Sequence, residues 1–142
     1  QAMRRALAAD CKNACMVRYN AVMVSDLFAK HELDNVVIHH PDPWLKTRQH
    51  KHRLIQEGFL QSLFQLQKPG AWLEFKTDSR DYFEWSLEKF ESSDYESEFV
   101  TWDLHKSEKA EANFVTHFEK IILEKEVPIH YALFRVPGTS IF

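Results

Sequence analysis

The chain has 142 residues, of which 44% are hydrophobic and 13% aromatic. This length and composition are typical of a single globular domain, over residues 1–142, and exclude a disordered chain. The formal net charge is −3, so any surface that binds an anionic partner must be local. The chain has only three glycines, at positions 58, 70 and 138, which are too dispersed to form a glycine-rich nucleotide loop.

No apolar run approaches the ~20 residues that a membrane-spanning helix needs. Residues 1–10 lack the apolar region of a signal peptide. Cys11 and Cys15 lie four residues apart in a segment with a helical pattern, and we interpret them as reduced, partly buried thiols. These features predict a cytoplasmic protein with no membrane contact, and they leave its oligomeric state open.

Hydrophobic periodicity predicts helices and strands in alternation along the chain. In order, we expect a helix over 2–14, a short strand within 16–24 ending near Asn20, a buried parallel strand over 34–40, a helix over 51–67, a strand over 71–78, a helix over 79–90 with Ser79 near its cap, a strand over 97–104, a helix within 113–126 and a last strand over 128–136. This alternation predicts an α/β fold with a mostly parallel sheet and helices on both faces.

Polar residues follow three of the expected strands, where open α/β sheets bind their ligands. They are Asn20, Asp42 and Asp78. Asp42 lies between Pro41 and Pro43, which restrict its backbone, so it is either a rigid site carboxylate or an ordinary turn aspartate. Asp78 is equally suited to a site or to a helix cap.

A basic stretch, HHPDPWLKTRQHKHR at 39–53, follows directly behind Asp42. Lys46, Arg48, Lys51 and Arg53 place four charges within eight residues and could bind phosphates. The alternative is a solvated helix start, which is disfavoured because positive charge has the wrong sign for a helix N-terminus. The histidines of this stretch match no recognised zinc-ligand spacing, so no metal site is predicted.

Three motifs resemble the bacterial tRNA (guanine-N7-)-methyltransferase family, from about residue 15 to the end. They are HPDPWLKTRQHKHRL, WLEFKTDSRDYFEW, and THFE followed by VPIHYALF. The resemblance implies a Rossmann-like class I methyltransferase fold. It also implies transfer of a methyl group from S-adenosylmethionine (SAM) to N7 of a guanine in the variable loop of tRNA.

The resemblance also implies roles for individual residues. Asp42 matches the catalytic aspartate and, with Asn20, the cofactor site. Substrate contacts are implied for Lys46, Asp78, Thr116, His117, Phe118 and Glu119, and RNA contacts for Arg48, Gln49, His50, Lys51, His52 and Arg53. From the residues alone, Thr116 with Glu119 three positions later also fits a helix-capping box, so both readings stay open.

The sequence departs from the family pattern in several places. The glycine-rich cofactor loop and the acidic residue that follows the second strand are absent. Leu45, Thr47 and His52 replace a usual proline and two basic residues, and Asn20 replaces a usual aspartate. We therefore expect the C-terminal part of a longer methyltransferase domain. The alternatives are an RNA-binding remnant or subunit that cannot bind cofactor, and a Rossmann-like domain that acts on another nucleotide.

Overall fold

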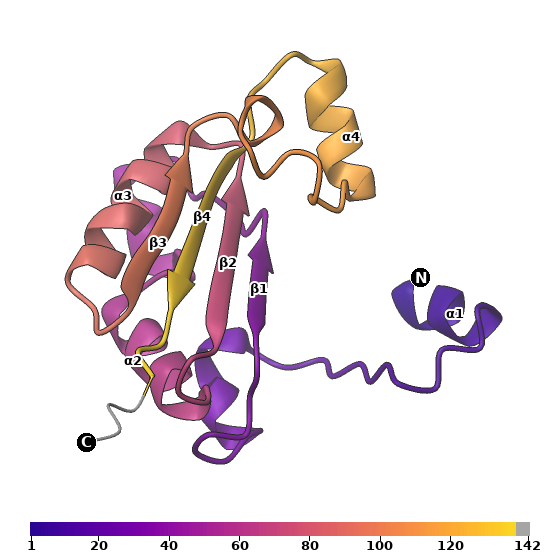
Figure 1. The fold of residues 1–142 in the computed structure, drawn as a ribbon, viewed down its shortest axis with the longest axis vertical. Coiled ribbons are helices and arrows are strands. Elements are labelled where there is room, and N and C mark those ends of the chain that lie inside the picture. The colour runs from indigo at the N-terminus through magenta and orange to yellow at the C-terminus, as the bar shows by residue number, and fades with distance from the viewer. Residues whose placement is uncertain (139–142) are drawn as a thin grey trace.

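The computed structural model describes residues 1–138 and forms one sheet with helices packed behind it (Figure 1). Its elements in chain order are α1 (Ala2–Ala8), the 3-10 helix η1 (Ala21–Asp26), β1 (Val36–His39), the 3-10 helix η2 (Thr47–His52), α2 (Glu57–Leu66), β2 (Trp72–Thr77), α3 (Arg80–Glu91), β3 (Glu96–Thr101), the 3-10 helix η3 (Leu104–Lys106), α4 (His117–Glu124) and β4 (His130–Arg135).

The sheet has the strand order β1-β2-β4-β3. β1 and β2 are parallel, with Val36 beside Leu73, while β4 runs antiparallel to both β2 and β3. The expected mostly parallel sheet is therefore a mixed one. Its strands were predicted close to their observed positions, but a strand pattern does not reveal that the last strand inserts between two earlier ones.

Helices α2 and α3 cover one face of the sheet (Figure 1). Helix α2 connects β1 to β2 and α3 connects β2 to β3, so both crossovers step toward the same edge of the sheet. Because such crossovers are right-handed, both helices lie on the same face. The expected helices on both faces are thus not found among residues 1–138. The core lies under α2 and α3, where Phe90 and Phe134 stack with ring centroids 3.7 Å apart and Leu73 is fully buried.

Side-chain caps fix the starts of α3 and α4. Ser79 Oγ accepts a hydrogen bond from the Tyr82 amide at 3.3 Å, as its predicted cap position requires. Thr116 Oγ1 accepts one from the Glu119 amide at 3.2 Å, which confirms the capping interpretation of Thr116. Asp78 is not the cap of α3, so its carboxylate remains free for another role.

The N-terminal segment differs from its prediction. Helix α1 ends at Ala8, has no buried residue and lies apart from the sheet (Figure 1). Residues 16–20 form no strand, because a strand needs a neighbour to pair with and the described sheet brings none beside them. Cys11 and Cys15 are exposed, contrary to the expected partial burial.

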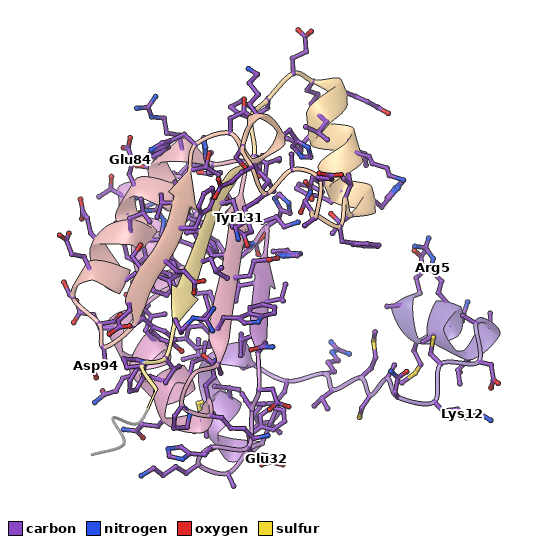
Figure 2. All side chains as sticks on the ribbon, in the orientation of Figure 1. Arg5, Lys12, Glu32, Glu84, Asp94 and Tyr131 are labelled. Atoms are coloured by element: carbon purple, nitrogen blue, oxygen red, sulfur yellow. The ribbon has the colours of Figure 1, made fainter. Side chains whose placement is uncertain are left out.

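Figure 2 shows the same separation in the side chains, with Arg5 and Lys12 far from Tyr131 on the sheet. Within residues 1–138, no helix has the length and apolar character to cross a membrane.

Candidate active site at the carboxyl ends of β1 and β2

The Asp42 turn is held in a strained backbone. The amide of His40 donates to the Lys76 carbonyl at 2.8 Å, which extends the parallel pairing one residue beyond β1. His40 (φ 49°) and Trp44 (φ 43°) then both adopt the left-handed conformation, which bulky side chains rarely adopt and which concentrates at functional sites. Between them the Asp42 side chain is exposed. The fold thus presents a rigid, accessible carboxylate at the carboxyl edge of the sheet.

His40 brings two predicted substrate residues together. Its side chain is 8% exposed, and its Nδ1 lies 3.5 Å from Asp78 Oδ1. Its ring centroid is 4.8 Å from that of Phe118. Burial lowers the pKa of His40 against the opposing effect of the Asp78 carboxylate, so the ring is neutral near pH 7. Among residues 1–138, the ring nitrogens of His40 make only the long contact with Asp78, so His40 is a buried polar group that is incompletely paired within the described fold.

Helix α4 lies beyond the ends of β1 and β2 (Figure 1). Its first residues, His117 and Phe118, are exposed, and Thr116 is half-buried at the cap. Glu119 differs from these neighbours because its side chain is fully buried and faces the sheet. Asp42, Asp78 and the start of α4 therefore share one edge of the fold, and the positions of Asp42 and Asp78 after parallel strands agree with their prediction.

The basic segment forms η2 and the residues that flank it. Lys46, Arg48, Lys51 and His52 are exposed, and Gln49 and His50 are half-buried. The His52 ring packs against Trp44, with centroids 5.3 Å apart. A patch of exposed positive charge therefore lies immediately behind Asp42, where it can meet phosphates.

Arg53 is placed differently from its basic neighbours. Its side chain is fully buried, with Nε donating to the Pro43 carbonyl at 2.8 Å and Nη2 paired with Asp81. The guanidinium lies 5.0 Å from the Tyr82 ring and 5.1 Å from the Trp85 ring. The predicted RNA contact of Arg53 does not agree with this burial. Its contacts instead hold the Asp42 turn against α3.

Asn20 also lies apart from the carboxylates. Its Oδ1 accepts a hydrogen bond from the Val22 amide at 3.2 Å and caps η1. The chain enters η1 near the amino end of β1, whereas α4 lies beyond the carboxyl end of β1 (Figure 1). In the described chain, the predicted cofactor contact of Asn20 therefore has no geometric connection to Asp42.

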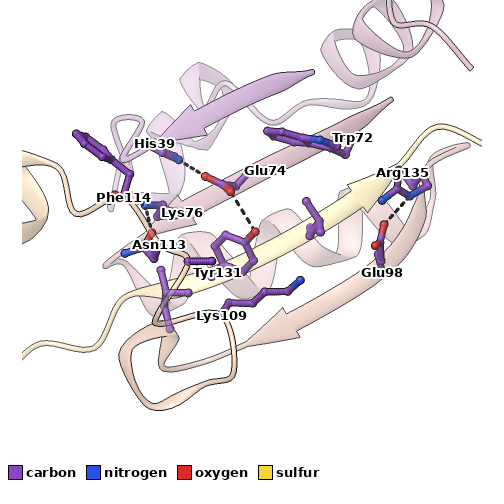
Figure 3. Close-up of a pocket in the computed structure, with 13 residues that line it drawn as sticks. His39, Trp72, Glu74, Lys76, Glu98, Lys109, Asn113, Phe114, Tyr131 and Arg135 are labelled. Atoms are coloured by element: carbon purple, nitrogen blue, oxygen red, sulfur yellow. Dashed lines mark hydrogen bonds and ion pairs between the residues drawn. The ribbon is translucent and has the colours of Figure 1, made fainter. Parts of the chain in front are cut away.

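The open face of the sheet carries polar residues that the sequence interpretation missed (Figure 3). They line a hollow of about 410 Å³. Glu74 accepts hydrogen bonds from His39 at 2.6 Å and from Tyr131 at 3.1 Å. Burial raises the pKa of Glu74, but these hydrogen bonds outweigh it, so the pKa lies below its usual value. A signal was present, because Glu74 and Lys76 alternate with the apolar Leu73 and Phe75 within the predicted strand.

Comparison with known proteins identifies the class of protein to which the chain belongs. Residues 1–132 match a family described as "Putative methyltransferase", and the chain belongs to this family. Within it, the chain is homologous to tRNA (guanine-N7-)-methyltransferases, which confirms the resemblance carried by the motifs. It is 45% identical over 131 residues to the enzyme of that name from Bdellovibrio bacteriovorus, and 37% identical over 118 residues to that from Lachnoclostridium phytofermentans.

These alignments cover 92% and 83% of this chain but 63% and 55% of the two relatives, so the chain spans somewhat more than half of their length. The fold is also similar to that of geranyl diphosphate C-methyltransferase from Streptomyces coelicolor, solved with S-adenosyl-L-homocysteine. The TM-score is 0.52 at 13% identity, over 93% of this chain and 57% of that chain. The α/β fold with its mixed sheet is thus similar to that of SAM-dependent methyltransferases.

Proposed function

We propose that this chain forms the methyl-accepting, tRNA-binding side of a tRNA (guanine-N7-)-methyltransferase. The observation that carries the proposal is the exposed Asp42 carboxylate, fixed at the carboxyl ends of two parallel strands and directly in front of an exposed basic segment. The name of the Bdellovibrio relative, at 45% identity, supports this reaction for the protein as a whole.

The acceptor atom determines what the residues must do. N7 of guanine carries an in-plane lone pair and no proton, so the reaction needs no general base. SAM, when bound, supplies an electrophilic methyl group on a positively charged sulfur. Asp42 stabilises the positive charge that moves from sulfur toward the base, and its rigid turn avoids reorganisation during transfer. We assign Asp42 as the catalytic residue on this basis.

The described residues fit only part of the cofactor. Asp42 suits its positively charged end. A nucleoside is usually held by a glycine-rich loop that allows close backbone approach, and Gly58, Gly70 and Gly138 are too dispersed along the chain to form one. Our proposal therefore limits the contribution of this chain to the methyl-donor end of SAM.

The remaining residues divide between base and backbone. Guanine presents N1–H and N2–H donors on its other edge, and the half-exposed Asp78 carboxylate is a suitable acceptor for them. The exposed Phe118 ring offers a surface on which an unstacked base can lie. Lys46, Arg48 and Lys51 contact phosphates, which supplies affinity and register more than base choice.

A second candidate is an RNA-binding remnant or subunit without transferase activity. It is favoured by the exposed basic segment, because Lys46, Arg48 and Lys51 can bind phosphates without any contact to a cofactor. It shares the basic segment with the first candidate, so tRNA binding alone does not separate the two.

Methyl transfer from labelled SAM to unmodified tRNA separates them, with the product nucleoside identified by chromatography. The assay compares the 142-residue chain with a fusion that adds the unmatched part of the Bdellovibrio relative. We expect 7-methylguanosine from the fusion. Its absence, with tRNA binding intact and the fusion folded, would favour the RNA-binding remnant.

A further inference from the structure

A buried ion pair connects the end of β2 to the first turn of α4. Lys76 Nζ lies 3.1 Å from Glu119 Oε2, and the two side chains are 1% and 0% exposed. Nothing in the motif interpretation singled out Lys76. It lies two residues before Asp78 in the chain, while Glu119 directly follows Phe118. The pair therefore joins the two segments that carry the proposed base contacts.

The groups around this pair form a closed network. Besides Glu119, Lys76 Nζ donates to Asn113 Oδ1 at 2.6 Å and to the Phe114 carbonyl at 3.2 Å (Figure 3), so each of its three protons has an acceptor. Glu119 Oε1 accepts from His105 Nε2 at 2.7 Å and from Asn113 Nδ2 at 2.9 Å. Burial raises the pKa of Glu119, but hydrogen bonds from Asn113, Lys76 and His105 outweigh it and lower the pKa.

Such a buried ion pair contributes little net stability to a fold, because both charges lose their hydration. An apolar pair of the same size would pack with less loss. Directional hydrogen bonds do what apolar packing does not, since they fix the position of one segment relative to another. Here the position that they fix is that of residues 113–119 above the ends of β1 and β2.

We propose that Lys76 is a positioning residue for methyl transfer: its ammonium group holds Glu119 and residues 113–114, so that Phe118 stands beside His40 and Asp78 at the proposed base site. This inference rests on the proposed function and adds a residue to it. Lys76 itself is buried and touches neither substrate nor cofactor. Both carboxylate oxygens of Glu119 already accept hydrogen bonds within the protein, so Glu119 positions α4 and does not accept a hydrogen bond from the base.

Lys76→Met tests the anchor directly, because methionine keeps the stem and removes the ammonium group. Lys109→Met is the matched control, since Lys109 lies by the same hollow, over the Phe99 ring at 5.5 Å, and is not in the network. Hydrogen exchange of the 142-residue chain reports anchoring without reference to activity. We expect amides of residues 119–121, which are hydrogen-bonded in the first turns of α4, to exchange at least tenfold faster in Lys76→Met and unchanged in Lys109→Met. Equal exchange in both variants would overturn the anchor.

Kinetics of the fusion protein test the consequence. We expect Lys76→Met to lower kcat for tRNA methylation by at least tenfold, with tRNA affinity within twofold because the basic segment is intact. If Lys76→Met does not fold, Asn113→Ala removes two bonds of the network and should lower kcat at least threefold. A folded variant with kcat within twofold of the parent overturns the positioning role.

The two proposals fail in different ways. If the folded parent fusion transfers no methyl group, the proposed function fails. Faster exchange in Lys76→Met would then identify Lys76 as a purely structural anchor, which also overturns its role in methyl transfer. If the parent is active and only the kinetic prediction fails, the proposed function stands and Lys76 is removed from it.

Discussion

Replacing Arg53 by methionine should destabilise the chain without weakening its electrostatic attraction to RNA. The charged hydrogen bond to the Pro43 carbonyl contributes about 1.5–3 kcal/mol. Cation–π contacts with Tyr82 and Trp85 add about 0.5–1 kcal/mol each. The pair with Asp81 adds less than about 1 kcal/mol because that carboxylate is 62% exposed. Methionine recovers part of the packing, so we expect a net loss of about 2–4 kcal/mol.

For a chain of this size, that loss lowers the Tm by roughly 6–12 °C. Urea denaturation followed by circular dichroism measures the free energy of unfolding, and filter binding of tRNA at several salt concentrations measures the charge contribution. Arg48→Gln and Lys51→Gln are the matched controls, because both side chains are exposed. Each control should change stability by less than about 0.5 kcal/mol and reduce the salt slope by about 0.7–0.9.

The opposite pattern would refute the reasoning. If Arg53→Met is as stable as the parent and its salt slope falls by about one, Arg53 contacts a phosphate. Its buried position against α3 would then not describe the protein in solution.

Three further outcomes follow from the site. Asp42→Asn should lower kcat of the fusion at least a hundredfold and leave tRNA affinity within twofold, and equal losses in both would remove Asp42 from catalysis. His40→Phe should raise the free energy of unfolding by about 1 kcal/mol, because it removes two buried nitrogens whose only partner among residues 1–138 is the distant Asp78 carboxylate, and it keeps a ring beside Phe118. A loss of stability measured by urea denaturation would show that the nitrogens are well paired in solution. Because the folded-state pKa of Glu74 lies below its usual 4.5, its ionised form stabilises the fold above that pH, and this contribution disappears as the pH falls through the folded pKa. Glu74→Gln should therefore lose less stability than the parent between pH 6 and pH 3, and parallel urea-denaturation curves for the two would contradict the lowered pKa.

Local signals were enough to predict much of this fold. β2 and α3 were predicted within about a residue of their observed bounds, because alternation, a proline-glycine stop and the Ser79 cap all act over a few residues. The same signals placed Asp42 and Asp78 at the ends of two strands, which the structure shows to be neighbours in the sheet. This is the part of the site that follows from sequence order alone.

The rest depends on contacts between distant segments. Lys51 and Arg53 are two residues apart and equal in charge, yet one is exposed and the other buried. The difference comes from α3, which brings Asp81 and two aromatic rings to Arg53 from about 30 positions away in the chain. Hydrophobic periodicity cannot report such a contact. Assigning every basic residue of this segment to RNA therefore overestimates the number of RNA contacts, because the fold buries Arg53.

Glu119 shows the same competition within a single motif. The Thr-x-x-Glu pattern predicts reciprocal caps, but the structure divides the two roles: Thr116 caps α4, and the Glu119 carboxylate turns toward Lys76. A cap is a local bond near solvent, whereas a buried ammonium without its carboxylate would cost several kcal/mol, so the tertiary partner prevails. The substrate role implied by the resemblance and the capping role implied by the pattern both overlooked this partner, because Lys76 lies 43 residues away in the chain. The carboxylate can therefore matter for methyl transfer through the position of α4, which makes Lys76 as informative a target for mutation as Glu119 itself.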